Sequence, residues 1–343
     1  MDKTFIIGSM AFLTLLLVAG VALIATGVAD RSAMSKTSSE PPFPVDVVCL
    51  WVDGTDALWR KQLQTHLAAE RLACPDAGIF HSADREPELQ QQDVRDELYY
   101  SAHSVVKFMP WVRKYYLVTM RPHKPLWWPS KGRMGTTKFV LVHHDQIFDG
   151  SLKLPTFNSN AIQRHISRIP GLAENFILFD DDCYAGQPLR KSDFFTKQGV
   201  PMVRMVPYFP GSQGSDAHWI KLCENTARLI STIIGLDKQV YFPAHVPLPA
   251  LKTVWNEVVF KGMGRQETRQ FKRFRSKYDF TVQYVMAGVM HGLGMLQPLP
   301  EDIETLYKEP GEHMDGLAPH LFCINHRLDK HNRAYLESLL NGP

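Results

Sequence analysis

An apolar run that ends in three consecutive aspartates is the feature that most limits how this chain can fold. The run FILF is followed directly by Asp180, Asp181 and Asp182, called the aspartate triplet below. A short apolar run is typical of a buried strand, whereas three adjacent carboxylates repel one another unless water, a cation or a hydrogen-bond donor compensates their charge. The sequence therefore predicts a buried strand that ends at a polar site.

Further strand-like runs alternate with helical patterns. VDVVCLWV from Val45, WVRKYYLVT up to Thr119 and KFVLVHH are predicted strands, and residues 94–106 carry apolar side chains at helical spacing. Residues 158–169 are predicted to form a helix that ends at Pro170-Gly171. Strands that alternate with helices predict an α/β fold with a Rossmann-like, mostly parallel sheet. Helices are also expected near 216–234, 249–262 and 278–291.

The N-terminal 30 residues are predicted to be a transmembrane signal-anchor. Residues 5–29 contain no charged side chain, and at about 1.5 Å per residue they could cross a hydrocarbon core of roughly 30 Å. Cleavage after Ala29 as a signal peptide is the alternative. A stem is expected over 31–44, a catalytic domain over 45–335 and a tail over 336–343. The expected protein is a single-pass type II membrane protein of the Golgi or another secretory compartment.

Charge and cysteine usage argue against two classes of function. The chain has 38 basic and 35 acidic residues and a net charge of +3, so nucleic-acid binding is not expected. Its five cysteines lack C-x-x-C spacing, so a zinc site is not expected either.

Polar residues follow three of the predicted strands. Asp53 and Asp56 follow the first, residues 143–145 (His-His-Asp) follow the third, and the aspartate triplet follows the last. Ligands of open α/β sheets bind beyond the carboxyl ends of the strands. Asp53 could instead make only a turn with Gly54, and the histidines could be a polar pair at a strand edge. A helix cap needs one carboxylate, so the triplet favours an oxygen-ligated cation, Mg²⁺ or Mn²⁺.

Three further sites offer polar groups. Asn158 and Asn160 lie at a predicted helix start, which suits either an anion or plain capping. His245 lies between prolines, where a fixed imidazole suits a general base or a structural role. Arg275 offers a donor fork for phosphate, or an ion pair with Asp279.

Four segments resemble, in the same order, the four conserved blocks of the Stealth family. They are DVVCLWVDGTD, LPTFNSNAIQRHISRIPGLAENFILFDDD, PAHVPLP and FCINHRLD. The family includes N-acetylglucosamine-1-phosphotransferase and bacterial capsule hexose-1-phosphate transferases. The resemblance implies transfer of a sugar 1-phosphate from a nucleotide-sugar, such as UDP-N-acetylglucosamine, to a hydroxyl of a glycan or glycoprotein, with release of a nucleoside monophosphate. A metal-dependent glycosyltransferase that releases a diphosphate and an inactive carbohydrate-binding relative are the alternatives.

The resemblance also implies roles for individual residues. Asp181 and Asp182 match a pair of acids that would hold the metal, and Asp180 stands where the family usually has Asn. His245 would be the base, and Arg275 would contact the transferring phosphoryl group. The residues implied to bind the substrate are Asp53, Asp56, Asn158, Asn160 and Asn325.

The fourth block departs from the family pattern. His326 follows Asn325 where the family usually has Asp, which puts the function of that block in doubt. The implied partners are a nucleotide-sugar donor, a glycan acceptor and the membrane, with a homodimer as one option.

Overall fold

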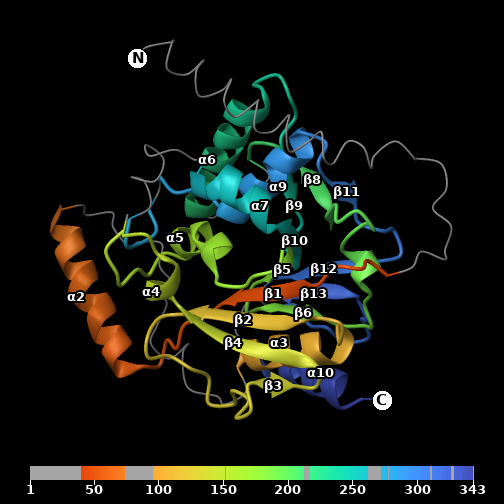
Figure 1. Ribbon diagram of the computed structural model, residues 1–343. Helices are drawn as coiled ribbons and strands as arrows, with labels where there is room; N and C mark the ends of the chain where they lie inside the picture. The colour runs from red at the N-terminus through yellow and green to blue at the C-terminus, as the bar shows by residue number, and fades with distance from the viewer. Residues whose placement is uncertain are drawn as a thin grey trace.

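A six-stranded sheet forms the centre of the computed structural model, which describes residues 40–73, 96–150, 152–211, 217–261, 272–276, 278–309, 311–325 and 328–342. The strand order is β10-β5-β1-β2-β4-β3 (Figure 1). Its strands are β1 (Val45–Leu50), β2 (Lys114–Thr119), β3 (Arg133–Met134), β4 (Thr137–His143), β5 (Asn175–Phe179) and β10 (Leu248–Leu251). The four inner strands β5, β1, β2 and β4 are parallel, and the edge strands β10 and β3 are antiparallel to their neighbours.

The other strands of the described residues form three smaller sheets. The antiparallel pair β6–β13 carries β12 on the far side of β13, and β7 pairs with β11 and β8 with β9. Their bounds are β6 (Cys183–Ala185), β7 (Met202–Val203), β8 (Met205–Pro207), β9 (Tyr241–Pro243), β11 (Gln297–Pro298), β12 (Thr305–Lys308) and β13 (Leu321–Ile324). Because β6 begins directly after Asp182, the aspartate triplet joins the main sheet to the sheet of β6, β13 and β12.

Helices cover both faces of the main sheet. The helices α6 and α9 pack on one face and α3 on the other, and Figure 1 draws α6, α7 and α9 toward the top of the view and α3 and α10 near β4 and β3. The helices and single turns are α2 (Ala57–Ala73), α3 (Glu97–Phe108), α4 (His144–Ile147), α5 (Ser159–Arg164), η3 (Ile166–Arg168), η4 (Lys191–Asp193), α6 (Ala217–Ile234), α7 (Lys252–Val254), η5 (Trp255–Lys261), α9 (Val282–Gly292) and α10 (Lys330–Asn341).

A hydrophobic core lies on each face of the main sheet. This explains why the inner strands have continuous apolar sequences. Side chains alternate between the faces of a strand, so Val48 of β1 packs with α6 and α9, whereas Val47 and Cys49 pack on the other face with α3. A strand buried on both faces has no exposed position that favours a polar residue. The apolar run therefore continues until the strand leaves the sheet, where the aspartates begin.

Two predicted helices differ from the structure. The helix predicted over 158–169 divides at His165 into α5 and the 3-10 turn η3. The helix predicted over 249–262 begins as the edge strand β10 and becomes helical only at Lys252. Short apolar runs are ambiguous between strand and helix, and here pairing with β5 decides for strand.

The predicted fold class and membrane topology need correction. Antiparallel pairs occur in three of the four sheets, so the architecture is a mixed α/β fold rather than a mostly parallel Rossmann-like sheet with an N-terminal membrane helix. The predicted anchor, residues 1–30, and most of the stem lie outside the described residues. Within the described part of the chain, no helix has both the length and the apolar character needed to cross a bilayer. The described residues therefore give no support to the predicted single-pass type II topology.

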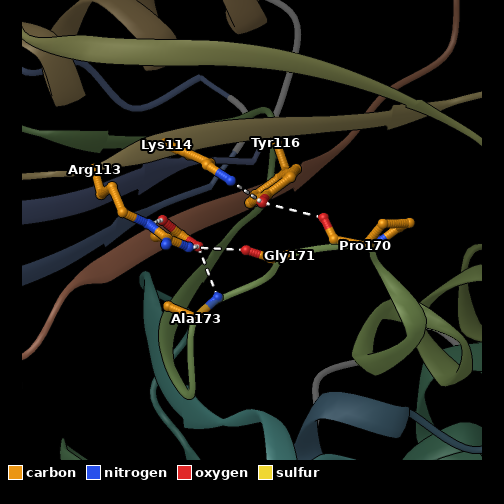
Figure 2. Close-up of polar contacts among 7 residues, drawn as sticks. Arg113, Lys114, Tyr116, Pro170, Gly171 and Ala173 are labelled. Carbon is orange, nitrogen blue, oxygen red and sulfur yellow. Dashed lines mark hydrogen bonds and ion pairs between the residues drawn. The ribbon is translucent and has the colours of Figure 1, made fainter.

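A polar network ties the amino ends of β1 and β2 to the segment before β5 (Figure 2). Arg113 donates from Nε and Nη2 to the two carboxylate oxygens of Asp46, at 2.9 and 2.5 Å. The backbone N–H of Ala173 donates to the same carboxylate at 2.7 Å. Nearby, Lys114 donates to the hydroxyl of Tyr116 at 3.1 Å. This network lies at the edge of the sheet opposite the aspartate triplet.

Candidate active site

The parallel strands bring two of the predicted clusters to neighbouring positions. β5 lies beside β1, with Cys49 level with Phe179, so the segments that carry Asp53 and the aspartate triplet leave the sheet from adjacent strands. His143 ends β4, which is separated from β1 by β2. The candidate site is therefore centred on the ends of β1 and β5.

Asp180 forms an ion pair with His245 at this centre. The Nε2 atom of His245 lies 3.6 Å from Oδ2 of Asp180, and the amide of Gln283 donates to the same oxygen at 3.3 Å. Burial opposes ionisation of Asp180, but the hydrogen bond and charge of His245, together with Gln283 and Arg275, hold its pKa below the usual value. Burial also opposes the charged form of His245, yet hydrogen bonds with Asp180 and Cys323 raise the pKa of that imidazole. Asp180 and His245 thus each favour the charged form of the other.

Asp181 lies among other carboxylates. Burial raises its pKa well above the usual value, and the charges of Asp182, Glu97, Asp180 and Asp96 raise the pKa further. Burial also raises the pKa of Asp182. A divalent cation would remove this repulsion, and carboxylate oxygens are the ligands that Mg²⁺ and Mn²⁺ prefer. The charge around Asp181 would favour a cation, whereas the described residues whose donor atoms converge within 4.8 Å are Asp182, Cys183, His245 and Cys323.

Sequence reasoning missed the two acids at the start of α3. Asp96 caps this helix by accepting a hydrogen bond from the N–H of Tyr99 at 3.0 Å, and Glu97 is its first residue. An aspartate just before a helical apolar pattern is a recognised start signal, so the cap could have been found. Its closeness to Asp181 depends on the packing of α3 and could not.

Asn158 is held entirely within the protein. It is fully buried, and its side chain accepts from the N–H of Asn160 at 3.0 Å and donates to Asp279 at 2.7 Å. The same amide nitrogen lies within 3.3 Å of the carbonyls of Lys272 and Phe274. Asn158 therefore fixes the start of α5 against the segment around residue 274.

Arg275 reaches the same helix start. Its Nη2 atom donates to Oγ of Ser159 at 2.5 Å, and its charge lowers the pKa of Asp180. The guanidinium is thus within electrostatic range of the aspartate triplet. The sequence suggested an ion pair between Arg275 and Asp279. In the structure the charge of Arg275 lowers the pKa of Asp279, but the hydrogen-bond partners of Asp279 are Asn158 and Ser276.

The carboxyl group of Asp279 makes stability depend on pH. Burial raises its pKa from 3.8 to about 6, against the hydrogen bonds of Asn158 and Ser276. The folded protein therefore binds this proton more tightly than the unfolded chain, and stability falls as pH rises from about 4 to about 6. The variant Asp279→Asn cannot ionise, so its free energy of unfolding should not fall in this way. As pH rises over this interval, we expect its free energy of unfolding to increase by about 3 kcal/mol relative to that of the wild type. Urea unfolding at several pH values measures this difference.

The matched control is Asp315→Asn, because Asp315 is exposed. The difference in unfolding free energy between that variant and the wild type should not change over the same interval. A constant difference between Asp279→Asn and the wild type would contradict the raised pKa.

The two aspartates after β1 hold the chain at the start of α2. Asp53 accepts from the N–H and hydroxyl of Thr55 at 2.9 and 2.6 Å, and Asp56 caps α2 through the N–H of Trp59 at 2.6 Å. His123, which sequence reasoning missed, accepts from the N–H of Asp53 at 3.1 Å and lies 3.7 Å from Asp56. The turn expected as the alternative role of Asp53 is therefore present.

The loop of His245 meets β12 and β13. The imidazole packs on Tyr307 with ring centroids 5.2 Å apart, and the side-chain amide of Asn325 donates to the hydroxyl of Tyr307. Tyr307 thus links Asn325 to His245, because it contacts both side chains. His326, the departure from the family pattern, lies outside the described residues.

The structural comparison finds a likeness to a glycosyltransferase. The crystal structure of the galactosyltransferase LgtC with donor and acceptor sugar analogues aligns with 11% identity and a TM-score of 0.45, covering 86% of this chain and 95% of that one.

Sequence comparisons identify the family. Residues 91–203 match the Stealth protein CR2, conserved region 2. The capsular polysaccharide phosphotransferase fcs1 of Haemophilus influenzae is 30% identical, covering 86% of this chain and 81% of that protein. The receptor polysaccharide phosphotransferase WefC of Streptococcus gordonii is 31% identical over 69% of this chain and 75% of that protein. Such bacterial relatives do not fit the predicted Golgi location, which is therefore corrected. By these matches the chain belongs to the Stealth family.

Proposed function

We propose that this protein transfers a sugar 1-phosphate from a nucleotide-sugar, such as UDP-N-acetylglucosamine, to a hydroxyl of a glycan acceptor and releases a nucleoside monophosphate. Family membership and the polysaccharide phosphotransferases among its relatives support a transferase acting on glycans. The observation that carries the proposal is the aspartate triplet at the carboxyl edge of the sheet, with His245 3.6 Å from Asp180.

Asp181 and Asp182, with Asp180 beside them, would hold Mg²⁺ or Mn²⁺. Such a cation neutralises the charge of the diphosphate and of the leaving phosphate. The acids of α3 support this assignment, because they add negative charge around Asp181. Without a cation, that charge opposes binding of an anionic donor.

His245, in its neutral form, takes the proton of the acceptor hydroxyl. Asp180 orients the imidazole, as a carboxylate orients the histidine of other acid–base pairs. The acceptor oxygen attacks the phosphorus that bears the sugar, and a new P–O bond forms. The bond from that phosphorus to the bridging oxygen of the diphosphate breaks, and the electron pair leaves with the nucleoside monophosphate. Arg275 contributes a positive charge toward the transferring phosphoryl group.

The proposed substrate-binding residues contribute through the three segments in which they lie. Asp53 and Asp56 shape the loop after β1 through their hydrogen bonds to Thr55 and Trp59. Asn158 and Asn160 position the start of α5, where Arg275 is held by Ser159. The side chain of Asn325 lies beside the ring that packs on His245. The predicted homodimer remains a prediction.

Product analysis tests the proposal. The full chain is incubated with a panel of nucleotide-sugars, Mg²⁺ or Mn²⁺ and glycan acceptors, and the released nucleotide is identified. We expect nucleoside monophosphate that forms only when acceptor and metal are both present. Release of nucleoside diphosphate would replace the proposal by a glycosyltransferase. Binding of nucleotide-sugar with no nucleotide released under any combination would instead favour an inactive relative.

A further inference from the structure

Two cysteines that are 140 residues apart face each other beside the aspartate triplet. Cys183 of β6 and Cys323 of β13 are directly opposite in an antiparallel pair. The N–H of Ile324 donates to the carbonyl of Asp182 at 3.0 Å, one position beyond this pair on each strand. That pattern makes the cysteines a non-hydrogen-bonded pair, in which the side chains approach most closely. Both thiols are almost fully buried.

Two further metal-binding side chains complete a four-membered cluster. The donor atoms of Asp182, Cys183, His245 and Cys323 all lie within 4.8 Å of one another, and Oδ1 of Asp182 is 3.8 Å from Sγ of Cys183. The thiols form the buried side of the cluster, while the side chain of His245 is 28% exposed. An ion could therefore enter past the histidine.

The donor set selects the class of ion. In a tetrahedral zinc site, metal–sulfur distances of about 2.3 Å and metal–nitrogen distances of about 2.0 Å separate the donor atoms by roughly 3.5–3.8 Å. The donor atoms lie within 4.8 Å of one another, so the cluster needs to contract by about 1.3 Å at most to reach this geometry. Thiolate and imidazole ligands suit Zn²⁺ and disfavour Mg²⁺. Asp180 beside His245 is also the kind of carboxylate partner that metal-bound imidazoles have.

We propose that Asp182, Cys183, His245 and Cys323 form a tetrahedral site for a thiophilic divalent cation such as Zn²⁺, distinct in chemistry from the oxygen-ligated cation of the proposed reaction. Binding exchanges the two thiol protons for the ion and releases them to solvent, with no change of oxidation state. The family resemblance assigns no role to either cysteine, and the absence of C-x-x-C spacing concealed the pair.

Occupation of this site would inhibit the enzyme. The ion would take the lone pair of His245 and a carboxylate oxygen of Asp182, which the proposed reaction needs. This consequence rests on the proposed function, whereas ion binding itself does not. Micromolar zinc should therefore suppress release of nucleoside monophosphate, and a chelator should restore it.

Cobalt binding tests the site without reference to activity. The full chain, kept reduced by a phosphine, is titrated with Co²⁺ and its absorption spectrum is recorded. We expect one equivalent to produce the intense near-ultraviolet band of thiolate-to-cobalt charge transfer and the visible bands of tetrahedral Co²⁺, and Zn²⁺ to remove both. A weak spectrum of oxygen-ligated cobalt alone would overturn the proposal.

Variants assign the ligands. Cys183→Ala and Cys323→Ala should each weaken cobalt binding by at least about a hundredfold, since replacing a residue that only hydrogen-bonds to a metal ligand already costs about 10–100-fold. Cys223→Ala is the matched control, because Cys223 is equally buried but lies in α6 outside the cluster. Should either cysteine variant fail to fold, His245→Gln at a partly exposed position should weaken binding and shift the visible bands. Unchanged spectra and affinity in these variants would overturn the site.

The outcome separates the two proposals. A thiolate band in a protein that releases no monophosphate would preserve the metal site and remove the proposed reaction. Monophosphate release by a protein without the band would preserve the reaction and remove the site.

Discussion

Asp181→Asn is expected to lower acceptor-dependent release of nucleoside monophosphate by about a thousandfold. Asparagine keeps the shape of the side chain but removes the charge that would hold the cation on the diphosphate. Metal stabilisation of a developing charge contributes several kcal/mol, and each 1.36 kcal/mol corresponds to about tenfold in rate. Initial rates at saturating metal measure the loss.

The same substitution should leave the metal-free protein as stable as the wild type or more stable. The pKa of Asp181 is raised by burial and by four neighbouring carboxylates, so its charge is unfavourable in the absence of a cation. Thermal unfolding in the presence of a chelator measures this effect. The two results together identify a residue retained for binding rather than for folding.

Asp145→Asn is the control for this prediction. Asp145 also follows a parallel strand, but it is half exposed and pairs with Arg121 at 3.0 Å away from the triplet. Its replacement should leave the rate within about twofold. Near-normal turnover by Asp181→Asn, or a loss explained by unfolding, would contradict the assignment.

The sequence predicted which strand ends border the candidate site, because their position depends on strand direction. Apolar runs marked β1, β2, β4 and β5, and parallel strands release their loops at one edge. Asp53 and the aspartate triplet could thus be placed near each other from pattern alone. The edge strand β10 was missed, because its pairing with β5 depends on tertiary structure.

The environment of the triplet could not be predicted in the same way. Asp96 and Glu97 reach Asp181 through the packing of α3, and Cys183 meets Cys323 only through the register of β6 with β13. Neither arrangement can be inferred from the spacing of these residues along the chain. Asn158 illustrates a different difficulty. Its residue type suits contact with a ligand, but the structure shows that its side chain makes hydrogen bonds within the protein.

Arg113→Met is expected to destabilise the protein by about 3–5 kcal/mol. Asp46 is completely buried, and Arg113 supplies two of the hydrogen bonds to its carboxylate. Methionine keeps the length of the side chain but leaves the buried carboxylate with the N–H of Ala173 as its only hydrogen-bond donor among the described residues. Removing one member of a buried ion pair costs about this much because the remaining charge is uncompensated. Urea unfolding of the purified variant measures the loss.

Arg121→Met provides the matched comparison for the buried pair. Arg121 also donates to an aspartate at 3.0 Å, but its side chain and that of Asp145 are 57% and 50% exposed. Water can solvate the aspartate that remains, so we expect a loss of at most about 1 kcal/mol. Equal losses in Arg113→Met and Arg121→Met would show that burial of Asp46 does not determine the strength of the network. A much larger loss at Arg113 would show that the pairing of Arg113 with the buried Asp46 is a main stabilising contact of the amino edge of the sheet.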